Sequence, residues 1–277
     1  MSKNKLVAPV LKWVGGKRQL IETFKPLLPN ISSYCEPFAG GGALFFHLQP
    51  KVAYINDINA DLMRVYDVIK KNVDELISEL KQYRNEQEFF YYIRGLDRDS
   101  EKYDSLSDIK KAARIIYLNK TCYNGLYRVN NAGEFNSPFG YYRNPNIVNE
   151  PVLRAVNKYF NSAEIYFSSV DYQEILSTIK KGTFVYLDPP YDPISATSNF
   201  TGYSRGGFSR DEQIRLCKCC DELNKRGVKF MLSNSQTPFI MNLYSKYNIK
   251  IIQAKRAINS DGNKRGDVNE IVVRNYE

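Results

Sequence analysis

Hydrophobic and polar positions follow one another along the chain in blocks that predict strands and helices. The run TFVYL (183–187) is β-branched and aromatic and carries no charge, which is typical of a strand buried on both faces of a covered sheet. Residues 31–48 have the pattern of a strand, a glycine-rich turn and a helix. Further strands are expected within 52–59, 163–172 and 228–235 and in a closing antiparallel pair, YNIKIIQAKRAI and VNEIVVRNY.

The middle of the chain has a different pattern. From about Asp61 to Lys120, charged and apolar positions follow helical spacing with few strand signals. Residues 121–145 contain two short strand-like runs on either side of an Asn-Ala-Gly sequence, which is typical of a hairpin turn. We therefore predict an α/β fold in which a doubly wound sheet is formed by residues 1–57 and 163–277, and a helical and β-hairpin domain of residues 58–162 is inserted between them.

Composition and charge restrict the class of partner. The chain has 277 residues, 43% of them hydrophobic, which is enough for one large core or for one core and a smaller insert. A net charge of +9 and a pI near 9.1 favour a polyanionic partner such as nucleic acid, the alternative being an unspecific basic surface. No stretch approaches 18 uncharged apolar residues, and the N-terminal segment lacks a secretion signal. We expect no membrane partner and a cytoplasmic location.

Histidine and cysteine usage limits the chemistry. His47 is the single histidine, so two-histidine metal sites and serine–histidine catalysis built on any other histidine are excluded. Cys217, Cys219 and Cys220 lie in a tract with helical spacing, and no second cysteine or histidine pair elsewhere completes a zinc site. We therefore expect free thiols and no metal.

The motif Asp188-Pro189-Pro190-Tyr191 directly follows the buried strand. Neither proline can donate to a ladder, so the strand ends there and Asp188 stands at its carboxyl end, where ligands bind in open α/β sheets. The lone pair of an exocyclic amine is delocalised into its ring, and acceptors aimed at the two N–H bonds localise that pair. The Asp188 carboxylate and the Pro189 carbonyl are two such acceptors, and the Tyr191 ring can stack on the base. The motif suits a methyl transfer that needs neither metal nor histidine.

Three glycines, Gly40–Gly42, separate a predicted strand from a helix. Glycine lets the backbone approach a ligand closely, and the start of a helix offers free N–H groups. The spacing is not G-x-G-x-x-G, which weakens a dinucleotide interpretation. Asp57 ends the next strand and suits a ribose diol, so the two features together favour a nucleoside-containing cofactor. Trp13 and Lys17 lie before a predicted helix, and on their own they favour a core tryptophan and a surface lysine.

The order of these segments resembles the Dam-type DNA adenine-N6 methyltransferases. The resemblance runs nearly end to end, through KWVGGKRQL, EPFAGGGALFF, INDIN, CYNGLYRVN, GEFNSPFG, VYLDPPYDP, FMLSNS and NEIVVRNY. It implies a Rossmann-like methyltransferase sheet, S-adenosylmethionine as methyl donor, and direct in-line transfer to N6 of an adenine flipped out of duplex DNA. The residues implied for the donor are Trp13 and Lys17 for its methionine part, Asp57 for its ribose, Asp171 for its adenine, Phe38, Gly40 and Gly42 for the pocket wall, and Asp188 at the reaction centre.

The predicted hairpin has the composition of a groove reader. Residues 121–150 hold only two basic residues, but seven asparagines and six tyrosines or phenylalanines. An electrostatic clamp would be richer in lysine and arginine, so this composition favours direct contacts to base edges. Arg128 is the candidate for a bidentate contact to guanine, and the resemblance of NGLYRVN points to 5′-GATC-3′. The other predicted DNA-binding residues form two groups. Tyr123, Asn124 and Leu126 are expected near the gap that the flipped base leaves in the stack of bases, and the rest are Asn136, Tyr142 and Arg143. The alternative is a hairpin that only packs on the helices.

Other functions stay open at this point. One is the same fold and chemistry on RNA or another amine, although an intact hairpin argues for DNA. Another is a catalytically silent DNA-binding protein, which would not need the DPPY motif, and a nicotinamide dehydrogenase is least favoured. We interpret the glycine-rich stretch 200–213 as a loop that orders over the flipped base. The sequence leaves open a monomer or a weak homodimer, and a cognate restriction endonuclease as a functional partner.

Overall fold

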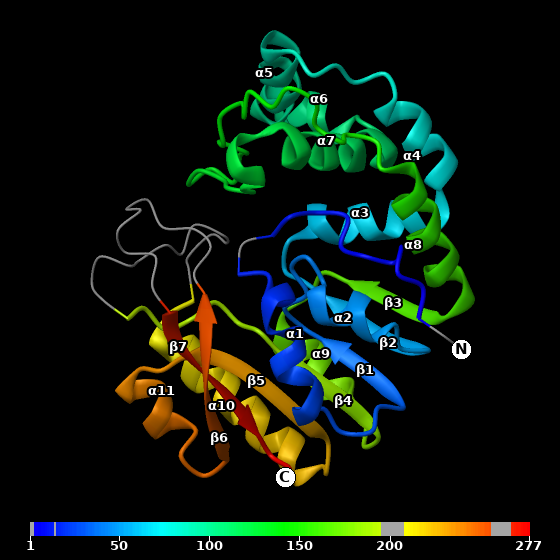
Figure 1. Cartoon of the computed structure of the whole chain (residues 1–277). Coiled ribbons are helices and arrows are strands. Elements are labelled where there is room, and N and C mark those ends of the chain that lie inside the picture. Colours follow the sequence, from blue (N-terminus) through cyan, green and yellow to red (C-terminus); the bar gives the residue numbers. More distant parts are fainter. Residues whose placement is uncertain (1–2, 14, 195–207, 256–266) are drawn as a thin grey trace.

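A single mixed sheet organises the first and last parts of the chain (Figure 1). The computed structural model describes residues 3–13, 15–194, 208–255 and 267–277. In these residues the sheet has seven strands, in the order β3-β2-β1-β4-β5-β7-β6. They are β1 (Ser33–Glu36), β2 (Val52–Asn56), β3 (Glu164–Ser168), β4 (Thr183–Leu187), β5 (Lys229–Ser235), β6 (Asn248–Lys255) and β7 (Asp267–Arg274). β1 to β5 run parallel, and β7 pairs antiparallel with β5 and β6, so the predicted sheet and its closing pair are confirmed.

The central strand β4 contributes to two apolar cores. All five of its residues are buried. Phe184 and Tyr186 belong to the core on one face of the sheet, whereas Val185 and Leu187 belong to the core on the other. This alternation follows from the pleat, because successive side chains of a strand leave on opposite faces. Both faces of β4 are covered, which is why TFVYL contains no charged position.

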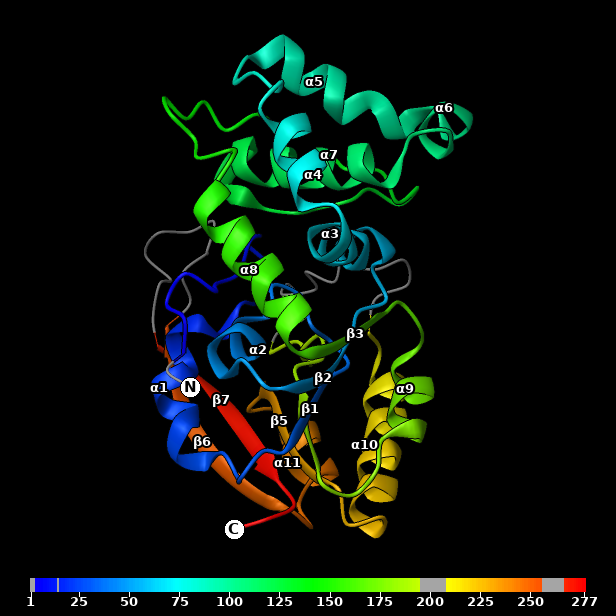
Figure 2. The ribbon, with the colours of Figure 1, turned by 90° about the vertical axis from the view of Figure 1, so that its right-hand side faces the viewer.

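Helices cover both faces of the sheet (Figure 2). One face carries α1 (Ile21–Phe24), flanked by the 3₁₀ turns η1 (Lys17–Leu20) and η2 (Lys25–Leu27), and α2 (Ala43–Leu48), α3 (Ala60–Lys71) and α8 (Glu150–Ser162). The other carries α9 (Tyr172–Thr178), α10 (Arg210–Lys225) and α11 (Pro238–Leu243). Leu216, Cys220 and Leu223 of α10 are spaced at i, i+4 and i+7, so they form one apolar stripe that packs on the sheet.

The predicted helical middle of the chain is confirmed. After α3 come α4 (Val73–Leu80), α5 (Gln87–Gly95), the turn η3 (Leu96–Arg98), α6 (Ser100–Asp104), α7 (Asp108–Thr121) and the turn η4 (Tyr123–Gly125). Helix α7 contacts α3, α4 and α5, and one apolar core continues from the sheet through α3 to α7. The division of the chain into two domains at residues 58–162 stays a prediction.

The hairpin after α7 is held by isolated bridges and by its own side chains. Val129 pairs with Phe135, and Cys122 pairs with Phe139, both antiparallel. Among the described hairpin residues these are isolated bridges and not parts of a continuous ladder. The side chain of Asn130 organises the turn, because its Oδ1 accepts hydrogen bonds from the backbone N–H groups of Ala132 and Glu134, both at 3.0 Å. An asparagine that bonds to nearby backbone in this way offers an alternative to a regular ladder.

A buried ion pair fixes the hairpin to the helices. The Arg114 side chain, only 1% exposed, lies 2.7 Å from Asp97 and donates to the carbonyls of Ile93 (2.9 Å) and Arg94 (2.8 Å). The Asp97 carboxylate also accepts a hydrogen bond from the backbone N–H of Phe135, at 2.8 Å. Asp97 therefore links α7 to the second half of the hairpin through one desolvated carboxylate.

The five cysteines are free and buried, as the sequence predicts for the thiols of α10. Burial raises the pKa of Cys217 to about 11 and that of Cys122 to about 12, so both thiols stay protonated near neutral pH. Within the described ranges, no group of three or more His, Cys, Asp or Glu side chains is placed to hold a metal ion. No helix in those ranges is long and apolar enough to span a membrane. Residues 200–207 of the predicted loop lie outside the described residues.

Replacing Asp97 by alanine tests the anchor, because it leaves the Arg114 guanidinium buried without its carboxylate. We expect the free energy of unfolding, measured by urea denaturation, to fall by about 3–5 kcal/mol. The matched control is Asp67→Ala, which removes one partner of the exposed Asp67–Lys71 pair and should lower it by less than about 1 kcal/mol. Equal losses in the two variants would contradict the anchoring role.

Candidate active site

Polar side chains converge at the carboxyl ends of the parallel strands. Glu36 ends β1, Asp57 follows β2, Asp188 follows β4, and Ser233 and Asn234 lie near the carboxyl end of β5. Because β1, β2, β4 and β5 run parallel, these ends lie along one edge of the sheet, where ligands of open α/β folds bind. The site predicted from DPPY and the glycine turn is therefore assembled on one edge.

Lys17 holds the carboxylate of Asp188. Its Nζ lies 3.0 Å from Asp188 Oδ1, and the side chains are only 9% and 17% exposed. The same oxygen accepts a hydrogen bond from Ser233 Oγ at 2.7 Å, and Lys17 also donates to the Gly15 carbonyl at 2.8 Å. The expectation of a surface lysine is wrong. Lys17 is buried because η1 lays it across the end of β4, where the carboxylate compensates its charge.

Tyr191 lies beside this ion pair. Lys17 Nζ stands 4.5 Å from the centre of the Tyr191 ring, and the Tyr191 hydroxyl donates to Glu270 Oε2 on β7 at 2.8 Å. Burial raises the pKa of Tyr191 well above its usual value, and the charges of Asp188 and Glu270 add to the effect. The phenol is therefore a neutral hydrogen-bond donor, and its ring face is in contact with the ammonium.

Side chains of α10 and β5 clamp the backbone after β4. The carbonyl of Pro190 accepts a hydrogen bond from Gln213 Nε2 at 2.8 Å, and the N–H of Asp192 donates to Asn234 Oδ1 at 3.1 Å. Asn234 in turn donates to Gln213 Oε1 at 3.1 Å. The buried carboxylate of Asp192 accepts from Thr237 Oγ1 at 2.7 Å. The rigidity predicted from the two prolines thus also depends on four polar residues that sequence reasoning did not select.

The glycine turn is tied to Asp57. Gly40 and Gly42 have φ of +48° and +64°, a left-handed conformation that glycine adopts readily. Asp57 accepts from the backbone N–H groups of Gly40 and Asn59, both at 2.9 Å, and the Tyr66 hydroxyl donates to the Gly40 carbonyl at 3.0 Å. Burial raises the pKa of Asp57, and the two backbone hydrogen bonds oppose the rise. Asp57 therefore shapes the turn that the sequence assigned to a cofactor.

Phe38 and Asp171, also predicted to bind the donor, contact residues on the side of the sheet covered by α9 and α10. Phe38 packs against Tyr172 and Phe208, with ring centres 5.1 and 5.9 Å apart. Asp171 caps α9 by accepting from the N–H of Gln173 at 2.8 Å, and it pairs with Arg215 at 2.6 Å. The carboxylate of Asp171 is thus engaged by its own neighbours, and its contact with an adenine stays a prediction.

Two buried polar residues at this edge were missed. Glu36 is 2% exposed and accepts a hydrogen bond from Tyr34 at 2.8 Å. Burial raises the pKa of Glu36 well above its usual range, the hydrogen bond from Tyr34 opposes the rise, and the charge of Asp188 adds to it. Asn56 donates to the carbonyls of Pro37 and Val170 at 3.1 and 3.0 Å and so ties the ends of β1 and β3 together. Each of these two residues is the polar last residue of an apolar strand, and this is the sequence signal by which they could have been found.

The predicted DNA-binding residues gather on the hairpin and η4. Tyr123, Asn124 and Arg128 are exposed, Leu126 is half-buried, and Arg128 Nε donates to Asn136 Oδ1 at 2.7 Å. Tyr142 and Arg143 follow the hairpin and are also exposed, and the Tyr142 carbonyl accepts from Asn85 at 2.7 Å. The alternative, a hairpin that only packs on the helices, accounts for its buried residues Tyr127, Phe135 and Phe139, and contact of the exposed residues with DNA stays a prediction.

Comparison with known proteins decides the family. Residues 13–258 match the family described as D12 class N6 adenine-specific DNA methyltransferase. The chain belongs to this family. It is 42% identical to the type II methyltransferase M1.LlaDCHI of Lactococcus lactis subsp. cremoris, over 100% of this chain and 98% of that protein. It is 44% identical to the type II methyltransferase M.MjaIII of Methanocaldococcus jannaschii (98% and 99% covered) and 31% identical to the DNA adenine methylase of Escherichia coli K12 (99% and 96% covered).

Family membership confirms the resemblance drawn from the motifs. The chain is a DNA adenine methyltransferase of the D12 class, so a nicotinamide dehydrogenase and an enzyme acting on RNA or on an unrelated amine are set aside. The matched residues 13–258 include Trp13, the glycine turn, the hairpin and the DPPY motif.

Replacing Gly40 by alanine in this methyltransferase should move Trp13. A Cβ on Gly40 would lie 2.8 Å from Trp13 Cδ1, whereas a Cβ on Gly133, also at positive φ, would have no atom within 4 Å. Each substitution imposes the left-handed penalty of about 1–2 kcal/mol. We expect Gly40→Ala to lower the free energy of unfolding by about 1 kcal/mol more than Gly133→Ala, and to shift the emission of Trp13, the single tryptophan. Indistinguishable variants would show that the turn and Trp13 are not packed together.

Proposed function

We propose that this methyltransferase transfers a methyl group from S-adenosylmethionine to N6 of adenine in duplex DNA, at 5′-GATC-3′. The observation that carries the proposal is Asp188. Its carboxylate stands at the end of β4 on a clamped backbone, next to a neutral Tyr191 ring and one strand from the glycine turn on β1. This placement is what an acceptor for an exocyclic amine requires.

The residues at the edge fit the methyl donor. S-adenosylmethionine supplies an electrophilic methyl carbon on a sulfonium sulfur. Trp13 and Lys17 would hold its methionine part, Asp57 its ribose and Asp171 its adenine, with Phe38, Gly40 and Gly42 as the pocket wall. The absence of side chains at the turn supports this fit, because a Cβ at Gly40 or Gly41 would lie within 3.1 Å of Trp13 and displace it.

Asp188 and Pro189 activate the amine by accepting its hydrogen bonds. The Asp188 carboxylate and the Pro189 carbonyl would each accept one N–H of the adenine amine and so localise its lone pair toward the methyl carbon. The transfer would be direct: the N–C bond forms as the S–C bond of the sulfonium breaks, S-adenosylhomocysteine leaves, and the methylated amine releases one proton to solvent. The Tyr191 ring stacks on the base. The clamp of Gln213 and Asn234 on the following backbone keeps these acceptors in place, which supports their role as a preorganised pair.

Lys17 controls access to this acceptor. Its ammonium lies on Asp188 and over the face of Tyr191, which is where the base must stack. Lys17 would therefore have to leave Asp188 before the base enters, and the carboxylate of the methyl donor would be its new partner. The exchange keeps the buried ammonium paired with a carboxylate in both states, so no uncompensated charge is left in the site.

The hairpin reads the DNA and the adenine is flipped out to reach Asp188. Arg128 leaves Asn136 and contacts guanine in the major groove, while Tyr123, Asn124 and Leu126 stand near the vacated stack. Tyr142 and Arg143 contact the flanking backbone. The names of two relatives, type II methyltransferases, support a cognate restriction endonuclease as a functional partner. The enzyme acts in the cytoplasm, as a monomer or a weak homodimer.

Transfer of label from radioactive S-adenosylmethionine tests the function. With one duplex that contains a single GATC and one in which those bases are scrambled, we expect label only in the first, at N6 of adenine. Asp188→Asn, which offers an N–H donor in place of one acceptor, should lower turnover by about 10²-fold or more. Asp67→Asn, an exposed control, should leave it unchanged. Label in both duplexes would refute the GATC assignment, and full turnover by Asp188→Asn would refute its role.

The contact of Arg128 with guanine predicts a loss confined to one base position. Arg128→Ala should reduce discrimination at that position by about 1–3 kcal/mol, measured as the ratio of kcat/KM for GATC and for single-base variants. Arg143→Ala should instead weaken binding to all sequences alike and reduce the salt dependence by about one charge. A uniform loss for Arg128→Ala would make it a phosphate contact.

A further inference from the structure

Trp13 lies between the glycine turn and the hairpin. On one side, its ring and Cβ leave no room for side chains at Gly40 and Gly41, where a Cβ would lie 2.8 and 3.1 Å from Trp13 atoms. On the other side, its ring stacks on Tyr127, with centres 4.7 Å apart and planes inclined by 22°. One side chain therefore touches both the proposed donor pocket and the proposed DNA reader.

Tyr127 occupies the inner face of the hairpin, directly before Arg128. It is 6% exposed and packs on Trp13 and on Phe135, whose ring centre is 5.6 Å away. Arg128, the next residue, is exposed and bonded to Asn136. Neighbouring side chains of extended backbone point to opposite sides, so a movement of the hairpin backbone that carries Arg128 toward DNA also displaces Tyr127.

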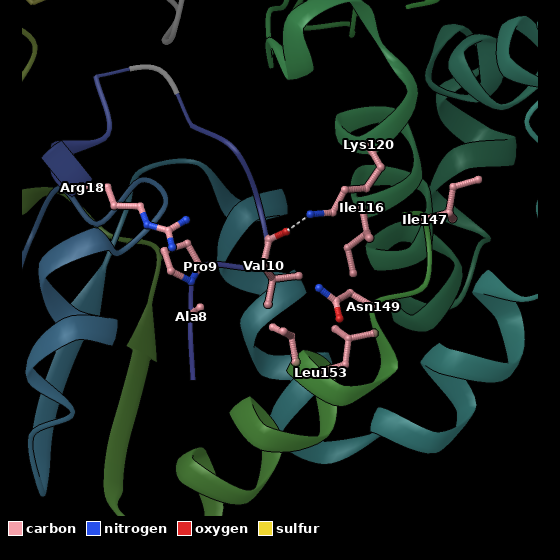
Figure 3. Close-up of a pocket in the computed structure, with 10 residues that line it drawn as sticks. Ala8, Pro9, Val10, Arg18, Ile116, Lys120, Ile147, Asn149 and Leu153 are labelled. Atoms are coloured by element: carbon pink, nitrogen blue, oxygen red, sulfur yellow. Dashed lines mark hydrogen bonds between the residues drawn. The ribbon is translucent and has the colours of Figure 1, made fainter. Parts of the chain in front are cut away.

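Two side chains of α7 hold the N-terminal segment against the same hairpin. Asn119 accepts from the N–H of Lys12 and donates to its carbonyl, both at 2.8 Å, and also donates to the Gly125 carbonyl at 3.1 Å. Lys120 donates to the Val10 carbonyl at 2.6 Å, beside a cavity of about 240 Å³ between this segment, α7 and α8 (Figure 3). The segment that carries Trp13 is thus fixed to α7, and Trp13 itself is in contact with the hairpin through Tyr127.

We propose that Tyr127 is a positioning residue that couples DNA reading by the hairpin to methyl-donor binding through Trp13. The proposal rests on the proposed function, because it requires both ligands. When duplex binds to the hairpin, the stacked contact between Tyr127 and Trp13 changes, and with it the packing of Trp13 on the glycine turn. By linkage, the factor by which duplex changes donor affinity equals the factor by which the donor changes duplex affinity.

Tryptophan emission provides the test, because Trp13 is the only tryptophan of the chain. A GATC duplex added to the wild-type protein without any cofactor should shift the Trp13 emission. The dissociation constant of S-adenosylhomocysteine, measured by calorimetric titration, should differ by about 5-fold or more with and without that duplex. In Tyr127→Leu and Tyr127→Met, which keep an apolar side chain but remove the stacked ring, the emission shift should disappear and the ratio should approach one.

Two control variants separate coupling from packing. Tyr127→Phe keeps the ring and should retain both the emission shift and the affinity ratio. Phe139→Leu removes another buried ring of the hairpin, one that packs on Phe90 and Tyr141, and should also retain both. Circular dichroism shows whether each variant is folded. If Tyr127→Leu is not folded, the comparison uses Tyr127→Met.

The outcomes distinguish this proposal from the proposed function. Wild-type protein that fails to bind S-adenosylhomocysteine, or binds GATC and scrambled duplexes alike, would contradict the proposed function. Wild-type protein that binds both ligands while Tyr127→Leu or Tyr127→Met keeps the wild-type ratio and emission shift would overturn the coupling alone. Loss of the ratio in Phe139→Leu as well would overturn it too, by showing a general effect of hairpin packing.

Discussion

A carboxylate withdrawn from water must be given a partner, and this requirement shapes the carboxyl edge of the sheet. Asp57 is satisfied by backbone N–H groups of the glycine turn and of Asn59, Asp188 by Lys17 and Ser233, and Asp192 by Thr237 and Arg210. The Glu36 carboxyl accepts a hydrogen bond from Tyr34, and burial raises its pKa. Each partner comes from a different element, so satisfying these acids fixes the turn, the DPPY backbone and the N-terminal segment relative to one another.

The ion pair between Lys17 and Asp188 links this architecture to the proposed chemistry. It joins the segment that carries Trp13 to the strand that carries the amine acceptor, and it covers the ring on which the base would stack. The same N-terminal segment is held by Asn119 to the hairpin. Family membership establishes DNA adenine methylation, and the ion pair suggests an order of events within it, with the donor engaging Lys17 before the base reaches Asp188.

The fold and the place of the site could be predicted because their signals are local. Five apolar residues before Asp188 make β4 a buried strand, two prolines end it, and glycines mark the turn after β1. The missed contacts depend on residues that only the fold brings together. Lys17 pairs with Asp188 from the other end of the chain, and Tyr127, an ordinary hairpin aromatic in sequence, meets Trp13. No periodicity or spacing encodes such pairs, so the motif around Lys17, taken alone, favours a surface lysine.

A crystal structure of the protein with S-adenosylhomocysteine would test the proposed movement of Lys17 through the distance between Lys17 Nζ and Asp188 Oδ1. That distance is 3.0 Å here. We expect Lys17 to turn to the carboxylate of the ligand, so that the distance exceeds about 4 Å, beyond an ion pair, and the face of Tyr191 is uncovered. A bound ligand with the Lys17–Asp188 pair still closed would contradict it.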